Sequence, residues 1–434
     1  MTALKSRLAE QIPAMRDRVK SLIAKHGDEV LCEVTVNQAY GGMRGVKSLV
    51  TETSAVDPQE GIRFRGYSIP EIREKLPNGP SGTQPLPEGL FYLLLTGEIP
   101  TDAQANEITR AWRAEENLPH YVAATLDALP ADTHPMTQFS IGISALQRDS
   151  IFARRYQEGM KKPEYWEAMF DDSMRLLGRL PLVAAYVYRR SYKNGDHIAP
   201  GGPELDWAGN LAHMLGSDDD NFKSLCRLYL TILSDHEGGN VSAHATHLVG
   251  SALSDPYLCL SAGINGLAGP LHGLASQEVM RWILQMKEQL GGGVPSEQQI
   301  RDYVWETLES GRVVPGYGHG VLRATDPRYV AQQRFAQERL PGDENYKIVQ
   351  MLYDIVPKIL TEQGKAKNPW PNVDAHTGCL FMYYGIKEYD FFTVLFGVSR
   401  AIGVMSSLIW DRALMLPLER PKSVTTDWIA TKFG

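Results

Sequence analysis

The chain has few cysteines, and their spacing excludes several site types. The four cysteines are Cys32, Cys226, Cys259 and Cys379, and no two of them form a CxxC pair. A thioredoxin-like redox motif or a cysteine zinc site is therefore excluded, and we expect free thiols in a reducing compartment. The sequence also lacks GxxxxGK[ST] and GxSxG, the patterns of the P-loop and of the hydrolase nucleophile elbow.

Excess positive charge and long apolar runs are absent as well. The 434 residues include 44 Lys and Arg against 51 Asp and Glu, a net charge of -7. This balance argues against nucleic acid as a partner, although a local arginine cluster could still bind a small anion. No uninterrupted apolar run approaches the roughly 18 residues of a membrane span, so we expect no membrane partner.

The first 27 residues have helical periodicity. Leu4, Leu8, Met15 and Val19 recur at the spacing of one helix face. Transit peptides are poor in acidic residues, and this segment contains Glu10 and Asp17. We therefore interpret it as the start of a mature chain. The last residues, TKFG, are not a peroxisomal signal.

Helical patterns dominate the remainder of the chain. Residues 297–311 place Ile300, Tyr303, Val304 and Leu308 on one face and end at a glycine, and residues 171–190 are apolar nearly all round in their second half. Alternation typical of strands occurs only in residues 32–36 and 62–67, and no βαβ rhythm is present. The sequence predicts an all-α fold with a minor β element, and its length favours two domains over one.

Three chemically suitable residues stand in Gly/Pro-rich segments. His272 lies in GLAGPLHGLASQEV, His319 in RVVPGYGHGVLRATDPRY and Asp374 in NPWPNVDAHTG. Two histidines and a carboxylate can supply two acids and a base, and an aspartate base needs a raised pKa or a very close substrate proton. Each residue also has a simpler possible role. His272 could be a histidine packed at a helix terminus, and His319 could lie in a tight loop between helices. Asp374 could be a helix N-cap, which is a very common role for aspartate.

Other histidines and arginines suggest two further sites. His236, His244 and His247 lie near Glu237 and could hold zinc, but HExxH is absent and two further ligands are not evident, which disfavours a metal site. Arg328, Arg400 and Arg420 would suit a small dicarboxylate, because a guanidinium binds a carboxylate with two hydrogen bonds. Each arginine alone is more often a surface ion-pair partner, and spacing cannot show whether they converge.

Nine segments in order resemble one family. GGMRG, DPQEGIRFRG, SDHEGGNVSAH, GLAGPLHGL, RVVPGYGHGVL, TDPRY, KAKNPWPNVDAHTG, FGVSRAIG and LERPKS together are similar to citrate synthases of the eukaryotic mitochondrial type. The resemblance covers nearly the whole chain. It implies an all-α homodimer, with a large domain of residues 1–272 and 381–434 and a small domain of residues 273–380 that closes over the substrates.

The resemblance also implies a reaction, which is the entry step of the tricarboxylic acid cycle. Asp374 would remove a methyl proton from acetyl-CoA, and His272 would stabilise the enol or enolate through the thioester oxygen. His319 would donate to the carbonyl of oxaloacetate, and citryl-CoA would then be hydrolysed to citrate and CoA. No cofactor and no metal are implied, since acetyl-CoA is a co-substrate.

Binding roles carry over residue by residue. The positions that match the oxaloacetate-binding residues are His236, Arg328, Arg400 and Arg420, the last supplied by the partner subunit. The positions that match CoA contacts are Arg44, Lys162, Val313, Val314, Gly316, Tyr317, Gly318, Arg323 and Asn372. The family type implies the mitochondrial matrix, with the cytoplasm as the alternative.

Three alternatives remain open from the sequence. A 2-methylcitrate synthase using propionyl-CoA would share these motifs, because one methylene changes specificity by only about 1–3 kcal/mol. A zinc-dependent hydrolase would use His236, His244 and His247. A non-catalytic acyl-CoA or dicarboxylate binder would need no base at Asp374.

Overall fold

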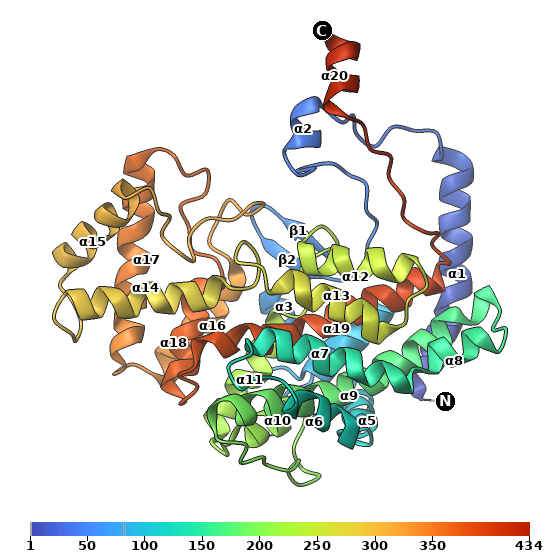
Figure 1. The fold of residues 1–434 in the computed structure, drawn as a ribbon, viewed down its shortest axis with the longest axis horizontal. Coiled ribbons are helices and arrows are strands. Elements are labelled where there is room, and N and C mark those ends of the chain that lie inside the picture. Colours follow the sequence, from blue (N-terminus) through green and yellow to red (C-terminus); the bar gives the residue numbers. More distant parts are fainter. Residues whose placement is uncertain (1, 81, 83) are drawn as a thin grey trace.

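The computed structural model describes residues 2–80, 82 and 84–434, and it is built mainly of helices (Figure 1). The predicted all-α class is confirmed. The N-terminal part contains α1 (Ala3–His26), α2 (Val36–Tyr40), β1 (Ser54–Asp57), β2 (Gly61–Phe64), β3 (Tyr67–Ser68), α3 (Ile69–Lys75), α4 (Pro87–Thr96), α5 (Asp102–Arg113), α6 (His120–Asp127), α7 (Pro135–Leu146), η1 (Gln147–Asp149), α8 (Ile151–Gln157) and η2 (Lys162–Glu164).

The remaining elements are helical in the described part of the chain. They are α9 (Tyr165–Tyr192), α10 (Trp207–Leu215), α11 (Asp220–Ile232), α12 (Val241–Ser251), α13 (Pro256–Leu267), α14 (Ala275–Gln289), α15 (Glu297–Glu309), α16 (Pro327–Arg339), α17 (Glu344–Gln363), α18 (Asp374–Tyr383), η3 (Tyr389–Phe391), α19 (Phe392–Ala413) and α20 (Thr426–Phe433).

One of the two predicted strand segments is a strand. Residues 62–67 contribute to β2 and β3 of a small antiparallel sheet in the order β1-β2-β3, with Val56 opposite Ile62. The prediction for residues 32–36 was wrong. These residues are mostly exposed and pair with no strand of the described chain, and Thr35 instead caps α2 by accepting from the Gln38 backbone N–H. Alternating residues do not form a strand without a partner to supply the ladder hydrogen bonds.

Two long helices form the centre of the molecule. α9 and α19 pack on each other, and nearly all residues of α19 are buried. The segment Tyr389–Ala413 is long and apolar enough to cross a membrane. Its most apolar 18-residue stretch has a mean hydropathy of 1.7, but 94% of that stretch is buried inside the molecule. A helix that is apolar all round is expected in the core of a large protein. Around this pair, α12 packs on α13, and α13 packs on α7.

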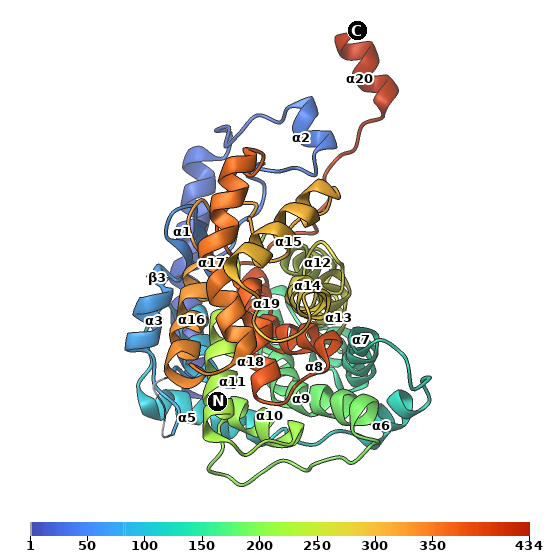
Figure 2. The same cartoon turned by 90° about the vertical axis from the view of Figure 1, so that its left-hand side faces the viewer.

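A second group of helices, α14 to α18, lies to one side of α19 in Figure 1, and this side of the molecule faces the viewer in Figure 2. Within this group α14, α16 and α17 pack on α18, and α15 packs on α17. α14 also contacts α19, and α16 contacts α11 and α3. Most candidate residues of the site lie at the ends of these elements or in the connections between them, and Arg400 lies inside α19.

Close packing joins α19 to the segment that carries His236. A Cβ atom built on Gly403 would lie 2.4 Å from the Ser234 carbonyl oxygen and 2.5 Å from Cβ of Asp235. Only a residue without a side chain allows this approach. The loop before His236 is therefore pressed against α19 less than one turn from Arg400.

Candidate functional site

The tautomer of His272 follows from its hydrogen bonds. The residue lies between α13 and α14, and its Nε2 accepts a hydrogen bond from the Ser242 backbone N–H at 3.2 Å, with Ser242 Oγ at 2.9 Å. Because a backbone N–H can only donate, Nε2 carries a lone pair and the neutral ring carries its proton on Nδ1. Burial, assisted by the charge of Arg400, lowers the pKa of His272 to about 4. At neutral pH His272 is a neutral donor through Nδ1–H.

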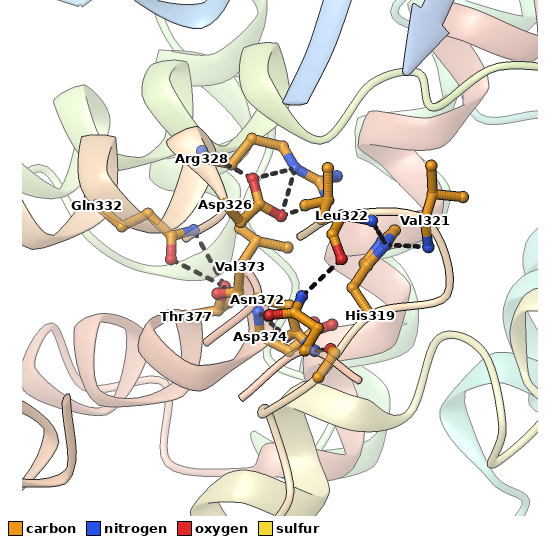
Figure 3. A network of polar contacts seen from close by, with 12 residues as sticks. His319, Val321, Leu322, Asp326, Arg328, Gln332, Asn372, Val373, Asp374 and Thr377 are labelled. Carbon is orange, nitrogen blue, oxygen red and sulfur yellow. Dashed lines mark hydrogen bonds and ion pairs between the residues drawn. The ribbon is translucent and has the colours of Figure 1, made fainter. Parts of the chain in front are cut away.

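His319 has the opposite tautomer. Its Nδ1 accepts hydrogen bonds from the backbone N–H groups of Val321 and Leu322, each at 3.0 Å (Figure 3). The proton of the neutral ring is therefore on Nε2. Burial and the positive charge of Arg328 lower the pKa of His319 to about 4. Its ring lies 5.3 Å from the ring of His236, between centroids.

Asp374 is the first residue of α18 rather than its N-cap. Its backbone N–H donates to Oδ1 of Asn372 at 3.0 Å, and its own Oδ1 accepts from Ser276 Oγ at 2.5 Å. Burial raises the pKa of the Asp374 carboxyl above its usual range. The Ser276 hydrogen bond and the charges of Arg328 and Arg400 oppose this rise. The result is a carboxylate that is more basic than an exposed aspartate.

Arg328 and Arg400 converge on the same region. Arg328 is buried and binds the Asp326 carboxylate with two nitrogens, Nη2 at 2.7 Å and Nε at 3.1 Å (Figure 3). Arg400 is only 2% exposed, and its Nε and Nη1 have no hydrogen-bond partner in the described chain. Burial lowers the pKa of Arg400 to about 10. A buried cation with two unsatisfied donors indicates a site for an anion.

His236 completes this arrangement. Its side chain is 8% exposed, and its Nε2 lacks a partner among the described residues. Burial and the charges of Arg328 and Arg400 hold its pKa well below the usual value, so the ring is neutral. Three neutral histidines beside two arginines keep the positive charge of the site on the guanidinium groups.

The loop that contains Val313, Val314, Gly316, Tyr317 and Gly318 docks onto the segment before Asp374. The Asn372 backbone N–H donates to the Gly316 oxygen at 2.9 Å, and the Asn372 side chain donates to the Gly318 oxygen at 3.0 Å. Gly316 has a φ of 79°, and a Cβ there would lie 2.8 Å from Cα of Ala375. Glycine is therefore required at this position to seat the loop against α18.

Two cavities open on either side of this loop. One of about 400 Å³ is lined by Tyr317, His319 and Lys367 among others, and one of about 560 Å³ by Pro270, Ala275 and Trp282 among others. Val313 and Val314 line both. Cavities of this size accommodate drug-sized ligands, and here they adjoin the segments of His272 and His319.

Three predicted binding residues do not join this site within one chain. Lys162 lies in η2 beside α1, where Arg16 donates to the Pro163 oxygen at 3.1 Å, and Arg44 lies in the loop after α2. Figure 1 shows α1 on the side opposite α15 and α17. Arg420 is exposed in the segment between α19 and α20. Arg323 lies next to the loop and donates to carbonyl oxygens at its own turn, including that of Val321 at 2.8 Å.

The zinc cluster that the sequence left as an alternative does not form among the described residues. His244 and His247 contact Glu419 and Asp411 instead of His236, and no group of three His, Cys, Asp or Glu side chains in the described residues could hold a metal ion. The zinc hypothesis therefore has no support in this geometry.

Three polar residues at the site were missed by the sequence reasoning. Ser276 and Ser242 contact Asp374 and His272, and Asp326 pairs with Arg328. Asp326 precedes a proline at the start of a helix, which is a signal for a capping residue. No local signal distinguishes the two serines from other helix-terminal serines.

The comparisons with known proteins agree on one family. The family model for the citrate synthase C-terminal domain matches residues 42–422. Mitochondrial citrate synthase of Xiphias gladius is 56% identical over 433 residues, covering 100% of this chain and 92% of that protein. The probable mitochondrial citrate synthase of Glossina morsitans morsitans is 57% identical over 426 residues, covering 98% and 91%.

Solved structures agree with this result. The citrate synthase from Pyrobaculum aerophilum aligns with a TM-score of 0.76 at 26% identity, covering 89% of this chain and 92% of that one. The enzyme from Thermotoga maritima aligns with a TM-score of 0.72 at 25% identity, covering 90% and 96%. On its sequence, its fold and the family model, the chain belongs to the citrate synthase family.

Proposed function

We propose that His272, His319 and Asp374 carry out the citrate synthase reaction of this chain, which joins acetyl-CoA to oxaloacetate and hydrolyses citryl-CoA. The observation that carries this assignment is the pair of fixed tautomers: two neutral histidines present N–H groups at Nδ1 of His272 and Nε2 of His319. Two donors with opposite tautomers beside one buried carboxylate fit a reaction with two carbonyl groups and one proton to remove.

The first step removes a proton from the methyl group of acetyl-CoA. Asp374 acts as the base, and the burial that raises its pKa makes it more basic. The methyl group is a very weak acid, so the negative charge that forms on the thioester oxygen must be stabilised as the proton leaves. His272 donates its Nδ1–H to that oxygen. The low pKa of His272 keeps the ring neutral at neutral pH, and its Nδ1–H stabilises the negative oxygen by a hydrogen bond without adding a positive charge to the site.

The second step forms the carbon–carbon bond. The enolic carbon attacks the carbonyl of oxaloacetate, and His319 donates its Nε2–H to the oxygen that becomes negative. Arg328, Arg400 and His236 hold the two carboxylates, and the unsatisfied Nε and Nη1 of Arg400 are available for one of them. Hydrogen bonds between charged groups of this kind fix both position and orientation.

Domain closure brings these groups together. We assign residues 273–380 to a small domain and residues 1–272 and 381–434 to a large one. The mutual packing of α14 to α18 supports this division. Asp374 and Arg328 then lie in the small domain, and Arg400 and His236 in the large one. Closure would exclude water, which strengthens the hydrogen bonds to the substrates.

A homodimer completes the substrate sites. Apolar side chains are exposed along the end of α1, the following loop and the C-terminal segment, among them Leu22, Ile23, Val30, Leu31, Leu418, Val424, Trp428 and Phe433. α20 projects from the body of the molecule (Figure 1). Exposed apolar surface of this extent is typical of an interface. Arg420 is then delivered to the oxaloacetate of the partner subunit, and Arg44 and Lys162 can reach the CoA phosphates there.

The relatives also suggest where the enzyme acts and on what. The curated relatives are named as mitochondrial, and we assign this chain to the mitochondrial matrix. A related archaeal citrate synthase from Thermoplasma acidophilum was solved with carboxymethyl coenzyme A and oxaloacetate. The substrates proposed here are acetyl-CoA and oxaloacetate, and the residues named above require no metal for their roles.

A thiol-release assay with oxaloacetate tests the proposal. Acetyl-CoA is expected to release CoA with a higher kcat/KM than propionyl-CoA, and the opposite order would identify a 2-methylcitrate synthase. The Asp374→Ala variant is expected to lose turnover while still binding oxaloacetate, whereas Asp302→Ala, a change at an exposed residue of α15, serves as the matched control. Citrate formation that survives Asp374→Ala would disprove the assigned base, and a protein that only binds would show no CoA release at all.

A further inference from the structure

The two histidines of α12 that the reaction does not use hold the C-terminal segment. His244 Nε2 lies 2.9 Å from Oε1 of Glu419, and His247 Nε2 lies 3.4 Å from its Oε2. The Glu419 backbone N–H donates to Ser251 Oγ at 3.0 Å. Three side chains of one helix therefore hold both the backbone and the carboxylate of a single residue in the segment after α19.

His247 is itself fixed from the other side. Its Nδ1 lies 2.7 Å from Oδ2 of Asp411, near the end of α19. The hydrogen bond that His247 donates to Asp411 and the charge of Glu419 raise the pKa of His247, while burial and the charge of Arg412 oppose this rise. Asp235 and Glu237 face the same small cavity as His247. The imidazole thus joins a carboxylate of α19 to a carboxylate of the following segment.

Arg420 follows directly after this anchored residue. It is exposed, and no hydrogen bond or ion pair is recorded for it within residues 2–80, 82 and 84–434. Pro421 restricts the residue before it to extended backbone. In extended chain, successive side chains point to opposite sides. Glu419 contacts α12 whereas Arg420 is exposed, so this backbone geometry favours an Arg420 side chain that is accessible to a partner subunit.

We propose that His244, His247 and Ser251 form a clamp on Glu419 that positions Arg420 for the oxaloacetate site of the partner subunit. The proposal rests on the role assigned above to Arg420. The clamp residues are positioning residues, since none of them lies at the reacting atoms. A long arginine side chain has many rotamers and loses much conformational entropy on binding. A fixed backbone at Arg420 reduces the entropy that remains to be lost when oxaloacetate binds.

A double-mutant cycle separates this role from plain structural support. Glu419→Ala is expected to raise the KM for oxaloacetate by about tenfold, less than the ~100-fold that a misplacement of about 1 Å can cause. The KM for acetyl-CoA should stay unchanged. On an Arg420→Ala background the same change should cost nothing more, because residues that act through one another are not additive. Glu419→Gln, which keeps the size of the side chain, should give a smaller rise.

Sedimentation and thermal melting accompany the kinetics. The fraction of dimer and the melting temperature should change no more in Glu419→Ala than in the control Asp218→Asn. This control alters a different histidine–carboxylate contact, in which Asp218 lies 2.7 Å from His213. Additive effects in the cycle, or an unchanged KM for oxaloacetate in Glu419→Ala, would overturn the clamp. An Arg420→Ala variant with an unchanged KM would overturn both the clamp and the role of Arg420. A wild-type protein that forms no citrate would instead refute the proposed function.

Discussion

The hydrogen bond between Ser276 and Asp374 controls the basicity of the proposed base. Ser276 Oγ donates to Asp374 Oδ1 at 2.5 Å, and among the groups that lower the pKa of this carboxyl it has the largest effect. A hydrogen bond to a charged group is worth about 1.5–3 kcal/mol. One pKa unit corresponds to about 1.4 kcal/mol. The Ser276→Ala variant should therefore raise the pKa of Asp374 further, because the charged carboxylate loses this hydrogen bond.

The direction of the kinetic effect follows from the sign of this shift. Asp374 must be ionised to remove a proton, so a higher pKa moves the acid limb of the pH profile upward. In Ser276→Ala the acid limb of kcat/KM for acetyl-CoA should move to higher pH. Well above this limb, the activity should approach that of the wild type, apart from any loss through a less well oriented carboxylate.

The assay is CoA thiol release between pH 5 and pH 9 with saturating oxaloacetate. Ser276→Asn retains a side-chain donor and should restore part of the original profile. Ser406→Ala is the matched control, because that hydroxyl donates to the Ile402 backbone oxygen at 2.8 Å within α19. An acid limb that does not move in Ser276→Ala, or a uniform loss of activity at every pH, would show that the serine does not set the basicity of Asp374.

Three further variants test other parts of the structure. Arg328→Lys cannot keep the two-nitrogen contact with Asp326, so the KM for oxaloacetate should rise about 10- to 100-fold in steady-state kinetics, and an unchanged KM would contradict the binding role. Gly316→Ala places a Cβ 2.8 Å from Cα of Ala375 at a φ of 79°, so calorimetry should show weaker CoA binding, whereas Gly320→Ala, with open space around it, should bind normally. His376 is fully buried with a pKa lowered to about 4, below the usual value of about 6.5, so the unfolded state takes up its proton first as pH falls. Urea unfolding should then show stability decreasing by about 2 kcal/mol from this group between pH 7 and pH 5, and a His376→Asn variant with the same pH slope would refute this account.

The sequence alone determined the features that depend on local pattern. The helix at residues 297–311 appears as α15, and the apolar segment within residues 171–190 lies in the buried part of α9, because periodicity reports directly which faces are covered. The family was identified from nine ordered segments, and the comparisons confirm it. The strand predicted at residues 32–36 was wrong, because alternation shows only that a segment could pair and not that a partner strand exists.

The tertiary structure decided everything that depends on which distant groups meet. The sequence named His272 and His319, but their tautomers depend on backbone N–H groups at Ser242 and at Val321, which only the folded chain brings to those nitrogens. His244 and His247 look like metal ligands in the sequence, and in the fold they hold Glu419. Protonation states and ion pairs depend on distances of a few ångströms between segments far apart in the sequence, 175 residues in the case of His244 and Glu419, and these distances are fixed only when helices pack together.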